Sequence, residues 1–348
     1  MENEVIKAFS PDTCHERLFE TRTPLLRFNE ERDIDTWREQ VREKLTELIG
    51  DMPERVPINV RVEWTKEHED FFEYRFVYDV EPETSVPAHL LVPHKAKKPC
   101  PVVICLQGHS TGMHISLARA IFDKDDETIK GGDRDFALQI VKEGYAALVI
   151  EQRGFGERIS QKTLHYNSYY RTTCYLPAMA AQLLGRTMVG ERVWDISRAI
   201  DAMAQFPEID LDRVACMGNS GGGTATYYAA CLDERIKIAM PSCAVCSFSQ
   251  SIGTLVHCAC NFVPSIGKYV DMGDLAVLIA PRKLLVVAGE KDTGFLLPGV
   301  EQEYKIIERV YEKAGAPDSC RLVVGPEGHR FYANPSWNVF RELSGFGE

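Results

Sequence analysis

The serine at position 220 lies in a sequence setting that suits a nucleophile. The apolar run Val214–Met217 leads directly into the sequence GNSGG at residues 218–222, and the segment that follows has a helical composition. A tight turn between a strand and a helix lifts a serine hydroxyl clear of the sheet, where the helix N-terminus favours developing negative charge. A phosphate-binding loop would carry a lysine after these glycines, and none follows. We therefore predict that Ser220 is a catalytic nucleophile.

Two later turns carry candidates for the base and the acid that such a serine requires. A serine hydroxyl reacts poorly at neutral pH without a base, and in this arrangement the acid precedes the histidine along the chain. Asp292 follows an apolar run that is typical of a buried strand, and Glu290 in the same turn is the alternative acid. His329 occupies the turn after a later run. We predict that His329 takes the proton from Ser220 while Asp292 fixes the tautomer of the imidazole.

The loop after the apolar run Val102–Leu106 is the candidate for stabilising an oxyanion. Gln107, Gly108 and His109 follow this run directly. A backbone N–H of this loop, with the N–H of Gly221, would bind the oxygen of a tetrahedral intermediate. We expect Gly108 to permit the backbone geometry, His109 to supply the N–H, and Gln107 to contact the substrate. The alternative is that Gly108 only makes a turn.

Composition excludes several classes of partner. The 348 residues carry a net charge of −11, without a block of Lys or Arg that would bind phosphate, so nucleic acid is not expected. No stretch of about 18 apolar residues predicts a membrane span, and the polar N-terminus has no apolar signal core. The odd count of 11 Cys argues against a complete disulfide framework and favours the cytoplasm. The oligomeric state is left open.

Two cysteine pairs approach the spacing of zinc ligands. They are Cys243-x-x-Cys246 and the pair Cys258 and Cys260, which follows His257. The second pair is separated by a single residue, unlike the usual two-residue spacing of a zinc knuckle. Small buried thiols are the simpler interpretation, so we expect neither a metal nor a cofactor.

The pattern of the elements predicts an α/β fold. Residues 1–54 are expected to form a helical extension, and residues 58–66 and 71–92 alternate as strands do. After Pro101 fully apolar runs alternate with helical segments, which indicates a mostly parallel sheet covered by helices on both faces. The runs are Val102–Leu106, Ala146–Ile150, Val214–Met217, Ile236–Met240, Leu284–Ala288 and Leu322–Val324, and the helices are expected at 133–143, 191–205, 221–231 and 299–314.

We expect residues 55–348 to form one catalytic domain with two lid-like insertions. Residues 155–190 and 243–280 are long connections, and loops beyond the carboxyl ends of parallel strands usually shape a binding site. Tyr169, Tyr170 and Arg171 could line such a site by position alone. The alternative is that both insertions only thicken the core.

The segment from about 85 to 345 resembles the dienelactone hydrolase and acetyl xylan esterase-like branch of the α/β-hydrolases. The resemblance implies ester hydrolysis, and Ser220, Asp292 and His329 match the catalytic triad of that branch. Dienelactone hydrolases proper use a cysteine nucleophile, whereas this chain has a serine. The motifs that carry the resemblance are Gln107-Gly108-His109, Glu151–Arg158, Leu184–Thr187, Val193-Trp194-Asp195, Gly218–Gly222, Ala280-Pro281-Arg282 and Gly328–Phe331.

Arg153 leaves two interpretations open. Carbohydrate deacetylases of a neighbouring branch carry R-G-Q here, whereas this chain has Arg153-Gly154-Phe155, so the motif does not indicate an acetylated sugar. Arg153 either binds a carboxylate or sugar oxygen of the substrate or is held structurally by Glu151, Glu157 or the lid.

The favoured function is hydrolysis of a small-molecule carboxylic ester, including esters of carbohydrate-like compounds, through an acyl-enzyme. A serine peptidase of the oligopeptidase type is a second hypothesis, disfavoured because only about 100 residues precede the first core strand, where those enzymes carry a large propeller. A binding protein that has lost catalysis is a third hypothesis, and it ranks low because all three triad residues are present.

Overall fold

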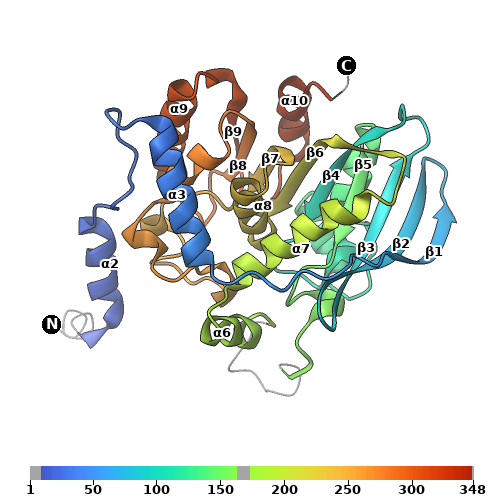
Figure 1. The fold of residues 1–348 in the computed structure, drawn as a ribbon, viewed down its shortest axis with the longest axis horizontal. Helices are drawn as coiled ribbons and strands as arrows, with labels where there is room; N and C mark the ends of the chain where they lie inside the picture. Colours follow the sequence, from blue (N-terminus) through green and yellow to red (C-terminus); the bar gives the residue numbers. More distant parts are fainter. Residues whose placement is uncertain (1–8, 163–172, 347–348) are drawn as a thin grey trace.

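The computed structural model describes residues 9–162 and 173–346, which are built around one large sheet (Figure 1). Its nine strands follow the order β1-β2-β3-β5-β4-β6-β7-β8-β9. The strands from β5 to β9 in this order are parallel, whereas β1, β2 and β3 pair antiparallel. The bounds are β1 Arg61–Glu67, β2 Phe71–Glu81, β3 Thr84–Pro93, β4 Cys100–Leu106, β5 Ala146–Ile150, β6 Ile209–Asn219, β7 Ile236–Ser242, β8 Lys283–Gly289 and β9 Cys320–Gly325.

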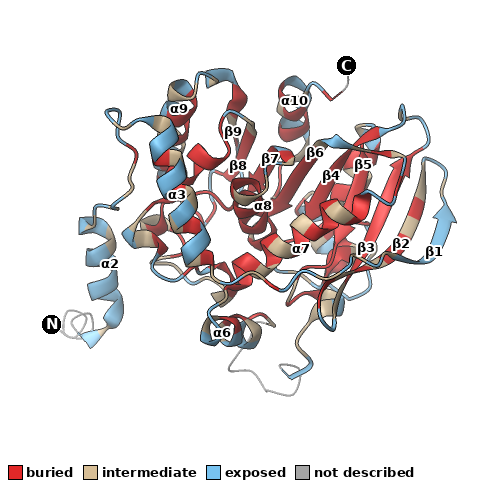
Figure 2. Cartoon of the chain, in the orientation of Figure 1, coloured by how far each residue is buried: buried red, intermediate tan, exposed pale blue. Residues whose placement is uncertain are grey.

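Helices cover both faces of this sheet, as predicted. One face carries α3 Ile34–Ile49, α7 Met188–Met203, α8 Gly221–Leu232 and α9 Leu297–Lys313; the other carries α5 Phe136–Lys142 and α10 Ala333–Ser344. Along β4, Val102, Ile104 and Leu106 belong to the first core, while Val103 and Cys105 belong to the second. Strand β4 thus fills two cores with alternate residues, which explains why it is apolar throughout. Figure 2 shows these central strands buried and β1 exposed at the edge.

The N-terminal extension contributes one helix to the main core. In α3, Trp37, Val41, Leu45 and Ile49 are buried at the four-residue spacing that predicted them, and Gly50 ends the helix with φ 88°. Helix α2, Pro11–Thr21, has no buried residue. The predicted boundary between an extension and a catalytic domain at residue 55 stays a prediction.

The two insertions follow β5 and β7. The first contains α6, Tyr175–Leu183, and its residues 163–172, with Tyr169, Tyr170 and Arg171, lie outside the described residues. The second is built of short 3-10 turns. The insertions share a small core that includes Phe155, Cys174 and Cys260. The remaining helix α4 covers Asp125–Gly131, and no helix in the described ranges is long and apolar enough to cross a bilayer.

Candidate active site

Ser220 lies in a strained turn between β6 and α8. Its backbone adopts φ 57° and ψ −122°, a conformation that residues with a Cβ seldom take. The turn is fixed because Ser220 N donates to Ser242 O at 2.8 Å. The flanking glycines are required by space, since a Cβ at Gly218 would lie 2.5 Å from Gly222 C and one at Gly222 would lie 2.2 Å from Leu106 O. The half-buried serine is therefore held at the N-terminus of α8.

Asp292 and His329 form a hydrogen-bonded pair in the loops after β8 and β9. Asp292 Oδ2 lies 2.7 Å from His329 Nδ1, and Asp292 Oδ1 accepts from Gly294 N at 2.8 Å and Phe295 N at 3.2 Å. Burial opposes ionisation of Asp292, but the hydrogen bond and charge of His329 outweigh it and hold the pKa of this carboxyl below its usual range. The alternative acid, Glu290, is exposed. Asp292 is thus the buried carboxylate of the pair.

Contacts across the sheet edge place this pair in the neighbourhood of Ser220. Ser242 O accepts from Ser220 N, and the next residue, Cys243, has its Sγ within 4.8 Å of the Asp292 and His329 side-chain donors and acceptors. Over the described ranges, no hydrogen bond joins Ser220 Oγ to His329. Such bonds are often long before substrate binds. The structure therefore pairs Asp292 with His329, while their roles as acid and base and their link to Ser220 stay predictions.

The predicted oxyanion loop lies against the turn at Ser220. A Cβ at Gly108 would lie 2.7 Å from Asn219 O and 2.9 Å from Ser220 Cβ. A Cβ at Gly221 would lie 2.9 Å from His109 Cε1. Gly108 thus permits a close approach, and the residues with the two expected N–H donors, His109 and Gly221, are adjacent.

The Gln107 side chain is buried and occupied by the protein itself. Its amide nitrogen donates to Ser116 Oγ at 2.6 Å and to Arg134 O at 2.8 Å. Its backbone carbonyl accepts from Gln152 Nε2 at 2.5 Å. These contacts hold the loop after β4 in place and use both amide hydrogens, so they favour a structural role for Gln107 over the predicted contact with a substrate.

Arg153 is held by carboxylates from two other elements. It makes two bonds of 2.9 Å to Asp195 of α7 and lies 2.6 Å from Glu81 of β2 and 3.3 Å from Glu191. The sequence had suggested Glu151 or Glu157 as structural partners, but Glu157 pairs with Arg75 and Glu151 accepts from backbone N–H groups. The contacts favour the structural interpretation of Arg153.

Arg153→Met is expected to destabilise the fold by about 3 kcal/mol, the lower end of the range for a broken buried ion pair, because Asp195 keeps Arg158 as a partner and Glu81 keeps Arg186. The free energy of unfolding in urea measures the change. The control is Arg55→Met, whose exposed pair with Asp201 should contribute about 0–1 kcal/mol. Unchanged stability together with a raised KM would instead assign Arg153 to substrate binding.

The two cysteine pairs whose spacing resembled that of zinc ligands do not come together as one group of potential metal ligands. Cys243 lies beside Asp292 and His329, and burial raises the pKa of its thiol to about 12, so it stays protonated at neutral pH. Cys246 contacts the carbonyls of Gln250 and Leu296. The proximity of Cys243 to the acid–base pair was not apparent from the sequence, in which it lies 49 residues before Asp292.

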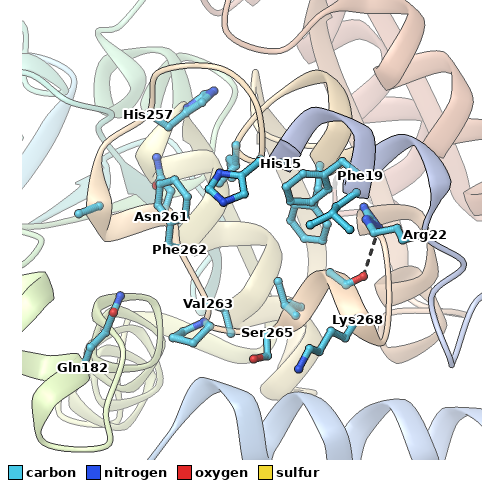
Figure 3. A pocket seen from close by; sticks show the side chains of 18 of the residues that line it. His15, Phe19, Arg22, Gln182, His257, Asn261, Phe262, Val263, Ser265 and Lys268 are labelled. Atoms are coloured by element: carbon cyan, nitrogen blue, oxygen red, sulfur yellow. Dashed lines mark hydrogen bonds between the residues drawn. The ribbon is translucent and has the colours of Figure 1, made fainter. Parts of the chain in front are cut away.

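A pocket of about 830 Å³ lies beside the site (Figure 3). It is lined by α2, α6 and the second insertion, and Ser220, Asp292 and His329 are not among its lining residues. His257 connects the two regions: it lines the pocket, its ring lies 4.9 Å from that of Phe295, and Phe295 stacks on His329 at 5.9 Å. Phe19 of α2 contributes to the wall, a role for the N-terminal extension that the sequence did not suggest.

Comparison with known proteins places this site in a family. The model of the Abhydrolase family matches residues 9–334. YtaP of Bacillus subtilis (strain 168), a protein named as a hydrolase, is 29% identical over 299 residues, which are 84% of this chain and 94% of YtaP.

Solved structures share the fold at low sequence identity. A glucuronoyl esterase from Solibacter usitatus has a TM-score of 0.66 and 16% identity, covering 94% of this chain and 97% of its own. One from Teredinibacter turnerae T7901 has a TM-score of 0.66 and 18% identity, covering 94% and 89%. An acetyl xylan esterase from Paenibacillus sp. R4 has a TM-score of 0.54 and 19% identity, covering 94% and 98%. The chain belongs to the Abhydrolase family, and it is a hydrolase with the α/β-hydrolase fold.

Proposed function

We propose that this hydrolase cleaves carboxylic esters through an acyl-enzyme formed on Ser220. The observation that carries the proposal is the buried, charged Asp292 bonded to His329 at the sheet edge where the strained Ser220 turn lies. A carboxylate bonded to Nδ1 leaves Nε2 of the imidazole free to accept a proton from a serine hydroxyl. Acyl transfer by serine requires an ionised acid, a base oriented by that acid, and a serine hydroxyl that the turn holds clear of the sheet.

In the first half of the reaction, Ser220 Oγ attacks the ester carbonyl as its proton passes to His329 Nε2. A bond forms between Oγ and the carbonyl carbon, and the carbonyl oxygen becomes an oxyanion. His329 then returns the proton to the leaving alcohol as the ester bond breaks. In the second half, His329 activates water, which attacks the acyl group and releases the acid and the serine.

The oxyanion is stabilised by N–H groups of two loops in this proposal. Gly221 is the first residue of α8, so its N–H points out of the helix start without a partner in the helix. His109 in the loop after β4 supplies the second N–H, and Gly108 lets that loop approach the serine. Such donors act strongly because they are fixed before charge develops.

For the substrate class, we propose esters on carbohydrate-like compounds rather than bare acetyl esters. The similarity to glucuronoyl and acetyl xylan esterases supports this class. The neighbouring pocket, with Phe19, Phe248 and Phe262 in its wall, could accommodate an apolar or sugar-sized remainder of the substrate. We also propose a reducing cytoplasmic location, since none of the eleven cysteines, all of which lie in the described ranges, forms a disulfide.

A fluorophosphonate probe and a panel of substrates test this function. We expect covalent labelling of Ser220 and turnover of esters from a panel of acetylated sugars, uronate methyl esters and lactones. Cleavage of aminoacyl or peptidyl substrates in preference to all esters would favour a peptidase. Absence of both labelling and turnover would favour a binding protein.

A further inference from the structure

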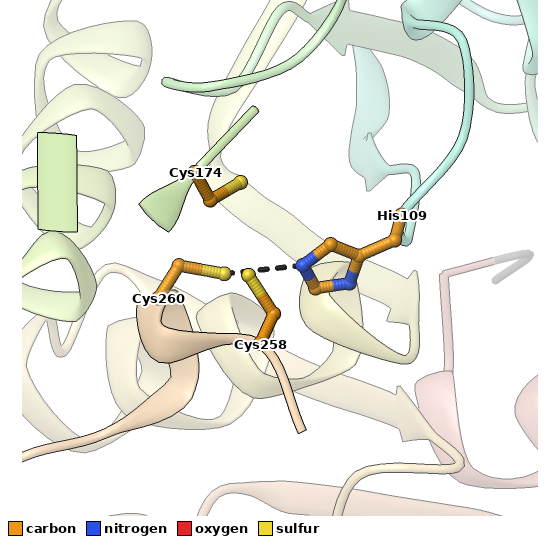
Figure 4. A group of neighbouring side chains, drawn as sticks. All are labelled: His109, Cys174, Cys258 and Cys260. Atoms are coloured by element: carbon orange, nitrogen blue, oxygen red, sulfur yellow. Dashed lines mark hydrogen bonds between the residues drawn. The ribbon is translucent and has the colours of Figure 1, made fainter. Parts of the chain in front are cut away.

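Four potential metal ligands meet where the two insertions approach the loop after β4. They are His109, Cys174 of the first insertion, and Cys258 and Cys260 of the second (Figure 4). One side-chain donor atom from each lies within 4.8 Å of all the others, and His109 Nε2 is 3.2 Å from Cys260 Sγ. The cluster joins residues that lie up to 151 positions apart.

The donor set and its spacing fit a tetrahedral zinc ion. Zinc binds thiolate sulfur at about 2.3 Å and imidazole nitrogen at about 2.0 Å, which separates tetrahedral ligand atoms by about 3.5–3.8 Å. The most widely spaced of the four atoms need to approach one another by roughly 1 Å at most, and His109 Nε2 and Cys260 Sγ, at 3.2 Å, need to separate slightly. Three sulfurs and one imidazole are ligands of a soft or borderline ion, whereas magnesium and calcium prefer oxygen.

Arg192 provides a second, independent observation. This arginine of α7 is 2% exposed, and it points its guanidinium at Cys260 Sγ at 3.3 Å and Cys174 Sγ at 3.4 Å. Its other contacts are the Arg153 carbonyl at 2.8 Å and the ring of Phe155, 4.5 Å from the guanidinium carbon. In the part of the chain that the structure describes, no carboxylate pairs with it. A buried cation in this position requires negative charge on the sulfurs.

We propose that His109, Cys174, Cys258 and Cys260 bind one zinc ion. Three thiolates and Zn²⁺ carry a net charge of −1, and Arg192 brings the buried group to zero. A disulfide between Cys174 and Cys260 would leave Arg192 facing only neutral sulfur, whereas zinc keeps both sulfurs as thiolates, so the charge balance favours the ion. This proposal replaces the expectation from the one-residue spacing of Cys258 and Cys260, because the chain supplies its other two ligands from distant loops.

The ion would be structural. Four protein ligands close its coordination, so no open position is left for water or substrate. It would tie both insertions to the loop after β4, whose His109 N–H we place in the oxyanion hole. His109 is exposed and Cys258 is half-buried, so two of the four ligand residues have contact with solvent.

Metal analysis of the full chain, purified without chelator, tests the site. We expect about one zinc per chain in the wild type and less than a tenth of that in Cys260→Ser and in Cys258→Ser, the latter being the less buried and so safer for folding. Cys320→Ser is the matched control: this buried cysteine of β9 contacts Pro317 O, and its variant should keep the metal.

Cobalt provides a test that needs no variant. Co²⁺ added to zinc-stripped wild type should give thiolate-to-metal absorption in the near ultraviolet and strong visible bands of a tetrahedral ion, both displaced by Zn²⁺. Stripped wild type that binds neither ion, or native protein with a disulfide among Cys174, Cys258 and Cys260, would overturn the proposal. Both readouts are independent of hydrolysis, so a failure of the esterase proposal would leave them unaffected.

Discussion

Ser220→Ala is expected to lower kcat for ester hydrolysis by about 10⁶-fold. The loss is large because the variant has no oxygen that can form the acyl-enzyme, whereas binding and the oxyanion donors remain. Substrate binding and the oxyanion donors are expected to leave a rate about 10³–10⁴-fold above that of the uncatalysed reaction in water. The ratio of wild-type to variant kcat is obtained from initial rates on one ester of the panel, with the wild type diluted until its rate can be followed in the same assay.

The backbone at residue 220 makes this substitution a clean test. Serine and alanine both carry a Cβ, so the strain of φ 57° is the same in both, and the folded state should be retained. Ser249→Ala, in the second insertion, is the control and should keep full activity. If Ser220→Ala hydrolysed esters at the wild-type rate, the nucleophile would lie elsewhere.

Local patterns in the sequence were sufficient to predict the sheet and the tight turn at Ser220. All six apolar runs lie in β4 to β9, because a strand covered on both faces must be apolar along its whole length. The turn at Ser220 was predictable because its glycines lie in one continuous strand–turn–helix stretch of the sequence, although the contact that crowds Gly222 most closely comes from Leu106 of β4. Chain order suggested Asp292 and His329 as a pair, because each occupies the turn directly after a parallel strand, and the structure brings the two side chains together.

Contacts between distant segments could not be predicted in this way. Glu81 and Asp195 reach Arg153 from β2 and α7, and neither has a sequence signal that identifies its partner. The same holds for His109 and Cys174, which meet Cys258 and Cys260 only through the packing of two insertions. Spacing rules for metal ligands assume that pairs lie close together along the chain, and here two ligands do not.

Asp292→Asn is expected to lower kcat by about 10⁴-fold while leaving the loop after β8 folded. The asparagine oxygen can still accept from Gly294 N and Phe295 N, so the backbone of this turn keeps its bonds. Its amide nitrogen then faces His329 Nδ1 and donates to it. That bond selects the imidazole tautomer with the proton on Nε2, where a base must instead accept one.

The neighbouring acid gives the matched control for this substitution. Glu290→Gln changes an exposed carboxylate two residues away and is expected to leave kcat unchanged. Steady-state rates of both variants on the same ester, with thermal unfolding to confirm that each is folded, separate the two acids. If Glu290→Gln were the inactive variant, the orienting carboxylate would be Glu290. The buried bond between Asp292 and His329 would then contribute to stability rather than to catalysis. Loss of kcat in a variant that stays folded identifies the acid that fixes the tautomer of the base.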